Sequence, residues 1–284
     1  MKLVLENVTK NYKEKKALRN INAQMSNGGL IGVIGKNGAG KTTLLKLLST
    51  IIKPSSGKIL LDGQNIAEKP SCMRAMLGYL PQDVSVYPNL TAMEYLHYVA
   101  AAKGMKRKEA SEQIDQLILE FHLSEVKDRR MSGYSGGMKQ KVGLICALLK
   151  DPQIILADEP TTGLDPAERI AVRNRLSALA KDRIVILSTH IVSDIEAVAS
   201  QVLMLREGKL IFCGSPYEIL SKADGCVWEY TVSFLPENMK GVSNMMQTKK
   251  GIYIRQVSRD KPERTAVAVS STLEDACLFA LEGL

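Results

Sequence analysis

The strongest constraint on the fold is a glycine-rich segment between a short apolar run and a helix-forming stretch. Residues 35–42 read GKNGAGKT and satisfy the pattern G-x-x-x-x-G-K-[ST]. The preceding run, Leu30–Ile34, has the composition of a buried strand, and the stretch Thr42–Ser49 favours a helix. A strand, this loop and a helix in that order predict a phosphate-binding loop, or P-loop.

Each residue type in the predicted P-loop has a chemical reason. Gly35, Gly38 and Gly40 allow backbone conformations in which successive N–H groups point at a phosphate. Lys41 places a cation on the β- and γ-phosphate oxygens, and the Thr42 hydroxyl is an oxygen ligand suited to Mg²⁺. The helix that begins there adds the positive end of its dipole. The loop therefore predicts binding of a nucleoside triphosphate together with Mg²⁺.

An acidic pair follows a second strand candidate. The apolar run Ile154–Ala157 leads directly into Asp158 and Glu159. A carboxylate at such a strand end can hold Mg²⁺ through water, and its neighbour can then orient and deprotonate an attacking water. A solvated strand end would show the same residues, but the P-loop in the same chain favours the catalytic interpretation. We expect Asp158 to hold metal and Glu159 to be the general base.

The first two-thirds of the chain alternates short apolar runs with segments of helical period. Ile184–Leu187 is a further buried-strand candidate. Thr91 and Glu94 have the spacing of a capping box, and Ala110–Phe121 repeats apolar residues at helical spacing. This alternation predicts an α/β domain with a largely parallel sheet.

The pattern changes after about Ser221. Three segments read as strands separated by polar turns, at Val227–Phe234, Gly251–Val257 and Thr265–Ser270. Thr272 is then expected to cap a short final helix. The chain therefore ends, in this interpretation, in a small α/β appendage.

Composition excludes several classes of protein. Apolar residues make up 45% of the 284 residues and charged residues 24%, which excludes disordered, collagen-like and disulfide-scaffold chains. The net charge of +8 suits anionic partners such as nucleotides, nucleic acids or membrane surfaces, but selects none of them. No apolar run approaches the roughly 18 residues that cross a bilayer. The N-terminus lacks a signal-like core, and we expect the scattered cysteines to be reduced cytosolic thiols.

A third motif completes a recognisable set. Residues 134–140 read YSGGMKQ and open an apolar helix, so Ser135 and the two glycines after it can form a second anion site. The order of motifs closely resembles the ATP-binding subunit of ABC transporters over about residues 1–215: P-loop, Gln82, Ser135-Gly136-Gly137, Asp158-Glu159, Gly163-Leu164-Asp165 and His190.

The resemblance implies the P-loop ABC ATPase fold, an α/β fold with a helical subdomain. It implies an ABC ATPase domain over residues 1–220, a helical signature subdomain at about residues 88–150 and a small C-terminal accessory region at 221–284. It further implies ATP hydrolysis in a homodimer or heterodimer whose ATP-driven closure powers a separate transmembrane permease subunit. The chain would then be peripheral at the cytoplasmic face of the cell membrane, with no nucleic acid partner.

The resemblance also assigns roles to single positions. Tyr12 matches an aromatic residue that stacks on adenine, Gln82 a residue that contacts Mg²⁺ or water, and His190 a switch at the γ-phosphate. Asp165 matches a loop that communicates across the dimer. The implied nucleotide-binding residues are Tyr12, Ala17, Gly35, Lys36, Asn37, Gly38, Ala39, Gly40, Lys41, Thr42 and Thr43, with Ser135, Gly136 and Gly137 acting in trans. The implied catalytic residues are Glu159, His190 and Gln82, and the implied metal ligands are Thr42, Gln82 and Asp158.

Two looser patterns bear on the branch of the family. Residues 272–276 (TLEDA) and 87–91 (YPNLT) resemble the ATPases of bacterial ABC-2 exporters. In such exporters the transported substrate contacts the permease, so the sequence of the ATPase does not specify it. Residues 134–138 (YSGGM) form the signature motif of this family, and they depart from its common form LSGGQ at Tyr134 and Met138. These departures put in doubt the flanking contacts, particularly a ribose contact from Met138.

Three other classes explain the motifs less well. A nucleic-acid ABC ATPase would insert a long coiled coil between P-loop and signature, where no sustained heptads occur. A translation-factor relative would carry two ATPase cassettes, whereas the sequence has one P-loop and one signature. A P-loop enzyme of small substrates would leave the Ser-Gly-Gly segment unexplained. His97 and His122 lack motif context, and we expect surface or packing roles for them.

Overall fold

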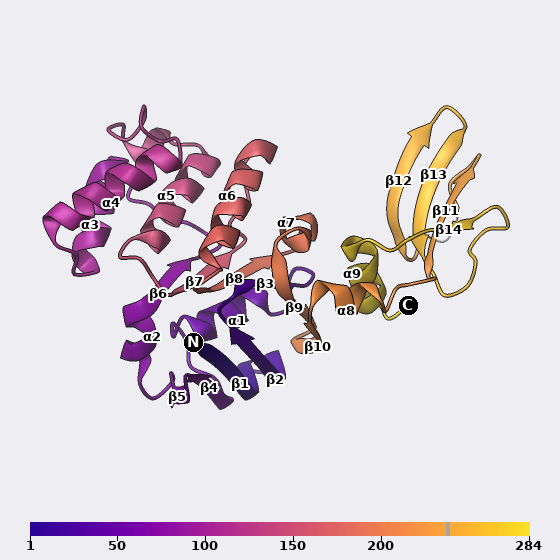
Figure 1. The fold of residues 1–284 in the computed structure, drawn as a ribbon, viewed down its shortest axis with the longest axis horizontal. Coiled ribbons are helices and arrows are strands. Elements are labelled where there is room, and N and C mark those ends of the chain that lie inside the picture. Colours follow the sequence, from indigo (N-terminus) through magenta and orange to yellow (C-terminus); the bar gives the residue numbers. More distant parts are fainter. Residues whose placement is uncertain (237–238) are drawn as a thin grey trace.

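The computed structural model describes residues 1–236 and 239–284 (Figure 1). Its centre is a six-stranded sheet in which five strands are parallel and only β10 is antiparallel to its neighbour. In spatial order the strands are β10 (Lys209–Gly214), β9 (Ala199–Arg206), β3 (Gly29–Ile34), β8 (Ile184–Thr189), β7 (Ile154–Asp158) and β6 (Leu77–Leu80). The largely parallel sheet predicted from the sequence is confirmed, and each of the three strand candidates lies within a strand.

Alternate residues of the buried strands face two separate cores. In β7, Ile154 and Leu156 pack toward α1 (Lys41–Leu48), whereas Ile155 and Ala157 face the opposite side. Helix α1, which begins at the last lysine of the P-loop, lies between the central sheet and a second, antiparallel sheet. That second sheet has the order β2 (Lys15–Ser26), β1 (Lys2–Tyr12), β4 (Ser56–Leu61) and β5 (Gln64–Asn65). Because α1 is packed on both sides, the P-loop rests on a rigid base.

Helices cover the other face of the central sheet and form the upper part of Figure 1. They are α3 (Ala92–Ala102), α4 (Arg107–Glu120), α5 (Gly136–Leu148) and α6 (Pro166–Leu179), with α2 (Pro70–Met76) beside β6 and a short 3₁₀ turn at Met131–Gly133. The capping box of Thr91 and Glu94 is confirmed at the start of α3. The stretch Ala110–Phe121 falls in α4 except for Phe121, which is the C-cap, and the apolar stripe of α4 is buried.

The C-terminal part contains a third sheet, antiparallel, in the order β12-β13-β11-β14. Its elements are α8 (Pro216–Leu220), β11 (Val227–Val232), β12 (Val242–Thr248), β13 (Gly251–Val257), β14 (Val267–Ala268) and α9 (Leu273–Glu282). The predicted strand Gly251–Val257 and the cap at Thr272 are confirmed. The other two strands are shorter than predicted, since β11 ends at Val232 and only two residues of Thr265–Ser270 pair.

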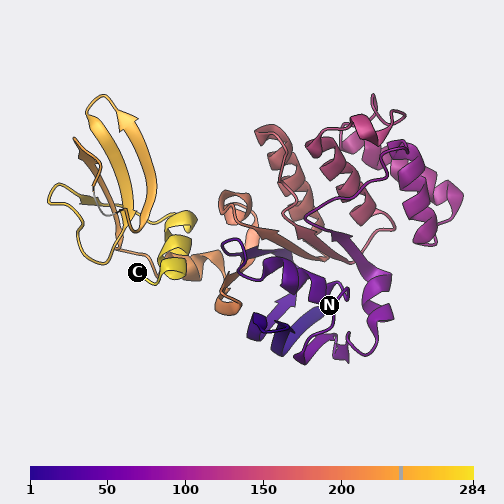
Figure 2. The same cartoon turned by 180° about the vertical axis from the view of Figure 1, so that it is seen from behind.

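Helix α9 lies beside α8 and β10 rather than over the whole third sheet (Figures 1 and 2). It buries Leu273, Ala276 and Cys277 in the same core cluster as Ile195 of α7 (Ser193–Glu196). Edge strand β12 is largely exposed, including Met245 and Met246. The division of the chain at residue 220 stays a prediction, but α9 contacts elements on both sides of it.

Candidate nucleotide site

The P-loop joins β3 to α1 in a backbone conformation that requires glycine. Gly38 and Gly40 have positive φ angles of 80° and 112°. A Cβ on Gly40 would lie 2.7 Å from Leu18 Cδ2 and 2.9 Å from the carbonyl oxygen of Ala17. Gly40 is also the N-cap of α1, where no side chain caps the first N–H groups. These donors are therefore free to bind an anion at the positive end of the helix dipole.

Lys41 is the buried cation of the site. Only 6% of the residue is exposed, and its Nζ donates a hydrogen bond of 2.7 Å to the carbonyl oxygen of Gly35. Burial lowers the pKa of Lys41, and the nearby carboxylates of Glu159 and Asp158 oppose that effect. A phosphate beside this ammonium would add a negative charge and favour the protonated form.

Glu159 lies between two basic side chains. Its Oε1 is 3.6 Å from Lys41 Nζ, and its Oε2 is 2.6 Å from Nδ1 of His190, which follows the end of β8. The backbone of Glu159 is left-handed, with φ of 52°. Its N–H donates to the carbonyl oxygen of Ser188 at 3.1 Å, and its own carbonyl accepts from Gln140 Nε2 at 3.2 Å. These bonds offset the strain of the turn and aim the carboxylate at Lys41.

Asp158 is fully buried at the end of β7 and is only half satisfied. The Ser188 hydroxyl donates to its Oδ1, whereas Oδ2 has no hydrogen-bond partner within the described residues. A buried carboxylate oxygen without a partner is costly, and water or a cation would relieve it. Nearby in the site, the Thr42 hydroxyl donates to Oε1 of Gln82 at 3.4 Å. All three predicted metal ligands thus present oxygens of the kind that Mg²⁺ prefers.

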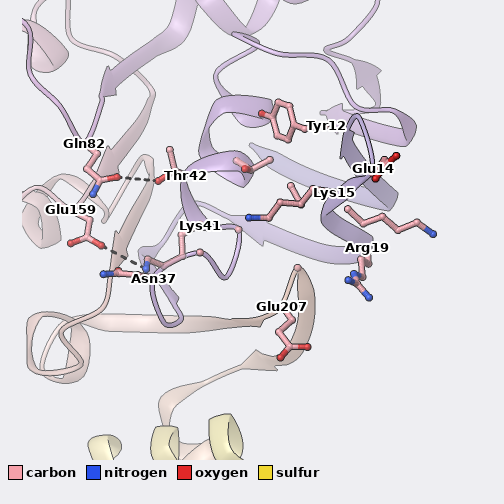
Figure 3. Close-up of a pocket in the computed structure, with 16 residues that line it drawn as sticks. Tyr12, Glu14, Lys15, Arg19, Asn37, Lys41, Thr42, Gln82, Glu159 and Glu207 are labelled. Carbon is pink, nitrogen blue, oxygen red and sulfur yellow. Dashed lines mark hydrogen bonds and ion pairs between the residues drawn. The ribbon is translucent and has the colours of Figure 1, made fainter.

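Most of these groups border a cavity of about 750 Å³ (Figure 3), but Gly35, Asp158 and His190 are not among the residues that line it. Eight of the predicted nucleotide-binding residues line it, together with Gln82 and Glu159: Tyr12, Ala17, Asn37, Gly38, Gly40, Lys41, Thr42 and Thr43. Tyr12 is 44% exposed and lies at the rim, with Lys10 Nζ 5.2 Å from the centroid of its ring. An exposed aromatic face beside a basic cavity is suited to stacking on a nucleotide base.

Several lining residues were not predicted from the sequence. They are Glu14, Lys15, Lys16 and Arg19 from the β1–β2 hairpin, and Glu207 and Gly208 from the turn between β9 and β10. The run of lysines after Tyr12 was the only local signal for the first group. No sequence motif marks the turn at Glu207 and Gly208, which tertiary contacts bring to the site. The Gly208 N–H donates to the Ala39 carbonyl oxygen at 3.0 Å, and the Gly208 carbonyl accepts from the Arg19 N–H at 2.7 Å.

The remaining predicted residues lie elsewhere. Lys36 points away from the large cavity, is 70% exposed and pairs with Glu282 at 3.4 Å, while Ala39 borders a smaller cavity of about 340 Å³ with Leu281. Ser135 caps α5 by accepting the Met138 N–H at 3.2 Å. Among the described residues that line the large cavity, none comes from Ser135–Gly137.

The loop from Gly163 to Asp165 contacts the signature. A Cβ on Gly137 would lie 2.9 Å from the Gly163 carbonyl oxygen, and Asp165 caps α6 by accepting the Glu168 N–H at 2.8 Å. His122 is exposed and His97 is half-buried on α3, away from the cavity of Figure 3.

Comparison with known proteins decides the family. The chain matches the ABC transporter family over residues 18–162. It belongs to that family. Relatives from Bacillus subtilis are the uncharacterized ABC transporter ATP-binding protein YxlF and the ATP-binding protein NatA, each 34% identical. The matches cover 81% and 75% of this chain and 76% and 89% of those proteins. The Nod factor export ATP-binding protein I of Paraburkholderia xenovorans is also 34% identical, over 78% of this chain and 73% of its own.

Solved structures give the same fold. An ATP-binding subunit of an ABC transporter superposes with a TM-score of 0.72 at 29% identity, covering 78% of this chain and 93% of its own. A dimeric bacterial ABC transporter cassette gives 0.70 at 25% identity, over 75% and 98%. The chain is thus the ATP-binding subunit of an ABC transporter and an ATPase with the ABC ATPase fold. No helix within the described ranges is long and apolar enough to span a bilayer.

Proposed function

We propose that this ABC ATPase works as a pair of chains enclosing two ATP molecules, each between the P-loop of one chain and Ser135–Gly137 of the other. The observation that carries the proposal is that one chain lines its cavity with the P-loop but with none of the described signature residues. Ser135 instead begins an exposed helix end that can accept an anion from outside. A two-fold symmetric pair completes both sites at once, and the dimeric cassette among the structural relatives supports it.

The chemistry assigned to the site is hydrolysis of ATP with Glu159 as general base. Lys41 exchanges the Gly35 carbonyl for the β- and γ-phosphate oxygens when ATP enters. Water attacks the γ-phosphorus while Glu159 takes a proton from it, and the bond between the γ-phosphorus and the β,γ-bridging oxygen breaks, so that ADP and inorganic phosphate are released. His190 holds the Glu159 carboxylate through the 2.6 Å contact, and we assign to it the role of switch at the γ-phosphate. Tyr12 stacks on the base.

The donor set described above fits Mg²⁺. Thr42, Gln82 and Asp158 would hold it, and Asp158 Oδ2 is the buried oxygen that still needs a partner. When bound, the ion supplies positive charge that neutralises the phosphates. Lys41 and the N–H groups at the start of α1 act on the same phosphates from the protein side.

The proposal places the chain at the cytoplasmic face of the membrane, attached to a separate permease and without a nucleic acid partner. Export is the favoured direction, because one relative is named as an export ATP-binding protein and residues 87–91 and 272–276 resemble exporter ATPases. Gln82, between the cavity and the helices that begin at Ala92, is the residue expected to face the permease.

Sedimentation tests the paired arrangement. The Glu159→Gln chain is expected to dimerise with ATP and Mg²⁺ and to remain monomeric with ADP. Ser135→Arg in the same background is expected to bind ATP and stay monomeric, because the added bulk lies at the trans face. Ser124→Arg, in an exposed loop, is the matched control for charge and size. A dimer that persists in the Ser135→Arg chain would refute the trans assignment.

A second experiment tests the membrane partner. The chain is co-expressed with a neighbouring reading frame that carries several apolar spans, and both are purified from solubilised membranes. Recovery of an ATP-hydrolysing complex supports the permease, and recovery of the ATPase without that partner contradicts it.

A further inference from the structure

Helix α9 is held by charges at both of its ends, and both charges come from the nucleotide-binding part of the chain. The N–H groups of a first helical turn have no partner within the helix, and neither do the carbonyl groups of the last turn. Anions are favoured at the first end and cations at the second. The first turn of α9 carries acids of its own, Glu274 and Asp275. From outside the helix, Glu196 adds an anion at this end and Arg206 supplies a cation at the other.

The N-terminal end of α9 contacts the segment that follows His190. The backbone N–H of Leu273 donates to Glu196 Oε1 at 3.0 Å, and Glu196 is the last residue of α7. In the same short helix, Asp194 accepts a bond of 2.6 Å from Thr161 and pairs with Arg169 at 3.0 Å. Helix α7 therefore joins α9 to the loop after Glu159.

Helix α7 is also packed against the strand that leads into the P-loop. Ile195 is fully buried, and a Cβ on Gly32 of β3 would lie 2.7 Å from its Cδ1. A larger residue at position 32 would displace the Ile195 side chain. The close contact transmits a shift of α7 to β3, because tightly packed interiors compress little.

The C-terminal end of α9 contacts the back of the P-loop. Arg206 Nη1 donates to the carbonyl oxygen of Leu281 at 3.0 Å and lies 3.5 Å from that of Ala280. Arg206 directly precedes the turn whose Gly208 N–H donates to Ala39 of the P-loop at 3.0 Å. Lys36 reaches the same end from the P-loop itself and pairs with Glu282 at 3.4 Å.

The third sheet is fastened to this helix from the other side. Asp275 of α9 is fully buried and accepts a bond of 2.7 Å from Arg255 of β13, as well as one of 2.6 Å from Ser243. Helix α9 has ten residues and is about 15 Å long at 1.5 Å per residue. It thus links α7, the P-loop and the third sheet.

We propose that Glu196 and Arg206 are positioning residues of the ATPase. Through their contacts with α9 they fix the position of α7, which follows His190, relative to the P-loop. Nucleotide binding at the P-loop is then coupled to α9, and through Asp275 to the third sheet. The role depends on the proposed function of the P-loop, Glu159 and His190. Neither Glu196 nor Arg206 lines the cavity of Figure 3, so any effect of changing them on turnover is indirect.

Steady-state kinetics of the full chain tests the two ends separately. Glu196→Ala is expected to lower kcat about two- to fivefold with little change in KM, the fold-change that corresponds to about 0.4–1 kcal/mol for a charge at a helix end. Arg206→Ala is expected to raise KM for ATP by a similar factor, because it frees the turn under the P-loop. Glu196→Gln, which keeps the acceptor, should recover part of kcat.

The matched control is Glu274→Ala, an exposed acid in the same first turn of α9. It is expected to leave both constants unchanged. A merely structural role predicts instead that Glu196→Ala and Arg206→Ala lower the melting temperature and alter neither constant below it. That outcome would overturn the proposal, and so would identical effects of Glu196→Ala, Arg206→Ala and Glu274→Ala on kcat and KM.

Amide hydrogen exchange separates this proposal from the function on which it depends. In the Glu159→Gln chain, ATP is expected to slow exchange in the P-loop and, together with it, in residues 273–276. With Glu196→Ala added, the P-loop should still respond while residues 273–276 should not. A P-loop that responds with an unresponsive α9 in the parent chain overturns the role of α9 alone. A P-loop that does not respond overturns the proposed function.

Discussion

The carboxylate of Glu159 bridges two basic residues: Oε2 lies 2.6 Å from His190 Nδ1 and Oε1 lies 3.6 Å from Lys41 Nζ. One side chain from the end of β7 therefore meets the P-loop and the loop after β8. Substitutions at each partner should separate binding of ATP from its hydrolysis.

Glu159→Gln is expected to bind ATP and hydrolyse it about 10²–10⁴-fold more slowly, because it keeps the shape of the side chain and loses the proton acceptor. Single-turnover hydrolysis with radiolabelled ATP measures the change, and a binding titration serves as its control. Hydrolysis within a few-fold of the wild-type rate would exclude Glu159 as the base.

Lys41→Ala is expected to weaken ATP binding as well as turnover, because it removes a buried cation from the phosphates of the bound ground state. Calorimetric titration with ATP gives the affinity. Lys46→Ala, in the last turn of the same helix, is the matched control and should bind normally. Equal affinities of the Lys41→Ala and wild-type chains would contradict the role given to Lys41.

Asp158→Asn is expected to reduce the dependence of ATP binding on Mg²⁺. The amide keeps one oxygen but loses the charge at the buried end of β7, where Oδ2 has no partner in the described part of the chain. The affinity for ATP is measured across a Mg²⁺ series and again with EDTA. A Mg²⁺ dependence identical to that of the wild type would remove Asp158 from the metal site.

The pair of Asp275 and Arg255 predicts a loss of stability in acid. Burial by itself raises the pKa of Asp275, but hydrogen bonds from Arg255, Ser243 and Thr272 outweigh it and bring the pKa below its ordinary value. A carboxyl group with a lowered pKa stabilises the fold above its unfolded-state pKa of about 3.9. That contribution is lost as the pH falls through the lower, folded-state pKa.

Urea unfolding between neutral and acidic pH measures this effect. Asp275→Asn should lower the free energy of unfolding by about 1.5–3 kcal/mol at neutral pH, because it removes charge-assisted hydrogen bonds from Arg255, which keeps its ion pair with Glu229 at 2.5 Å. The substitution should also flatten the acid branch of the stability curve. Asp260→Asn, at an exposed site, is the control and should leave the curve unchanged. Parallel curves for the Asp275→Asn and wild-type chains would contradict the prediction.

What the sequence predicted well depends on short-range patterns. The P-loop needs only a strand, three glycines and a helix within one segment, and the caps at Thr91 and Thr272 lie within four residues of their partners. The buried strands β3, β7 and β8 are continuous apolar runs because both of their faces are covered.

What the sequence did not predict depends on contacts between distant segments. Strand β12 reads VSNMMQT and lacks clear alternation, since most of it is exposed. The hydrogen bond from Gln140 to the Glu159 carbonyl and the approach of Glu207 to the cavity join separate elements. The antiparallel sheet of β1, β2, β4 and β5 was likewise not predicted, because its charged residues and register shifts obscure the period of two.

The exposed edge strand β12 contains two methionines that can report on its solvent exposure through their oxidation. Met245 and Met246 are 45% and 56% exposed, so dilute peroxide should convert both thioethers to sulfoxides readily. Met25 and Met131 are buried and provide slow internal standards in the same digest. Whatever comes to cover β12 would slow oxidation at the first pair relative to the second, so mass spectrometry can follow the state of the third sheet without any added probe.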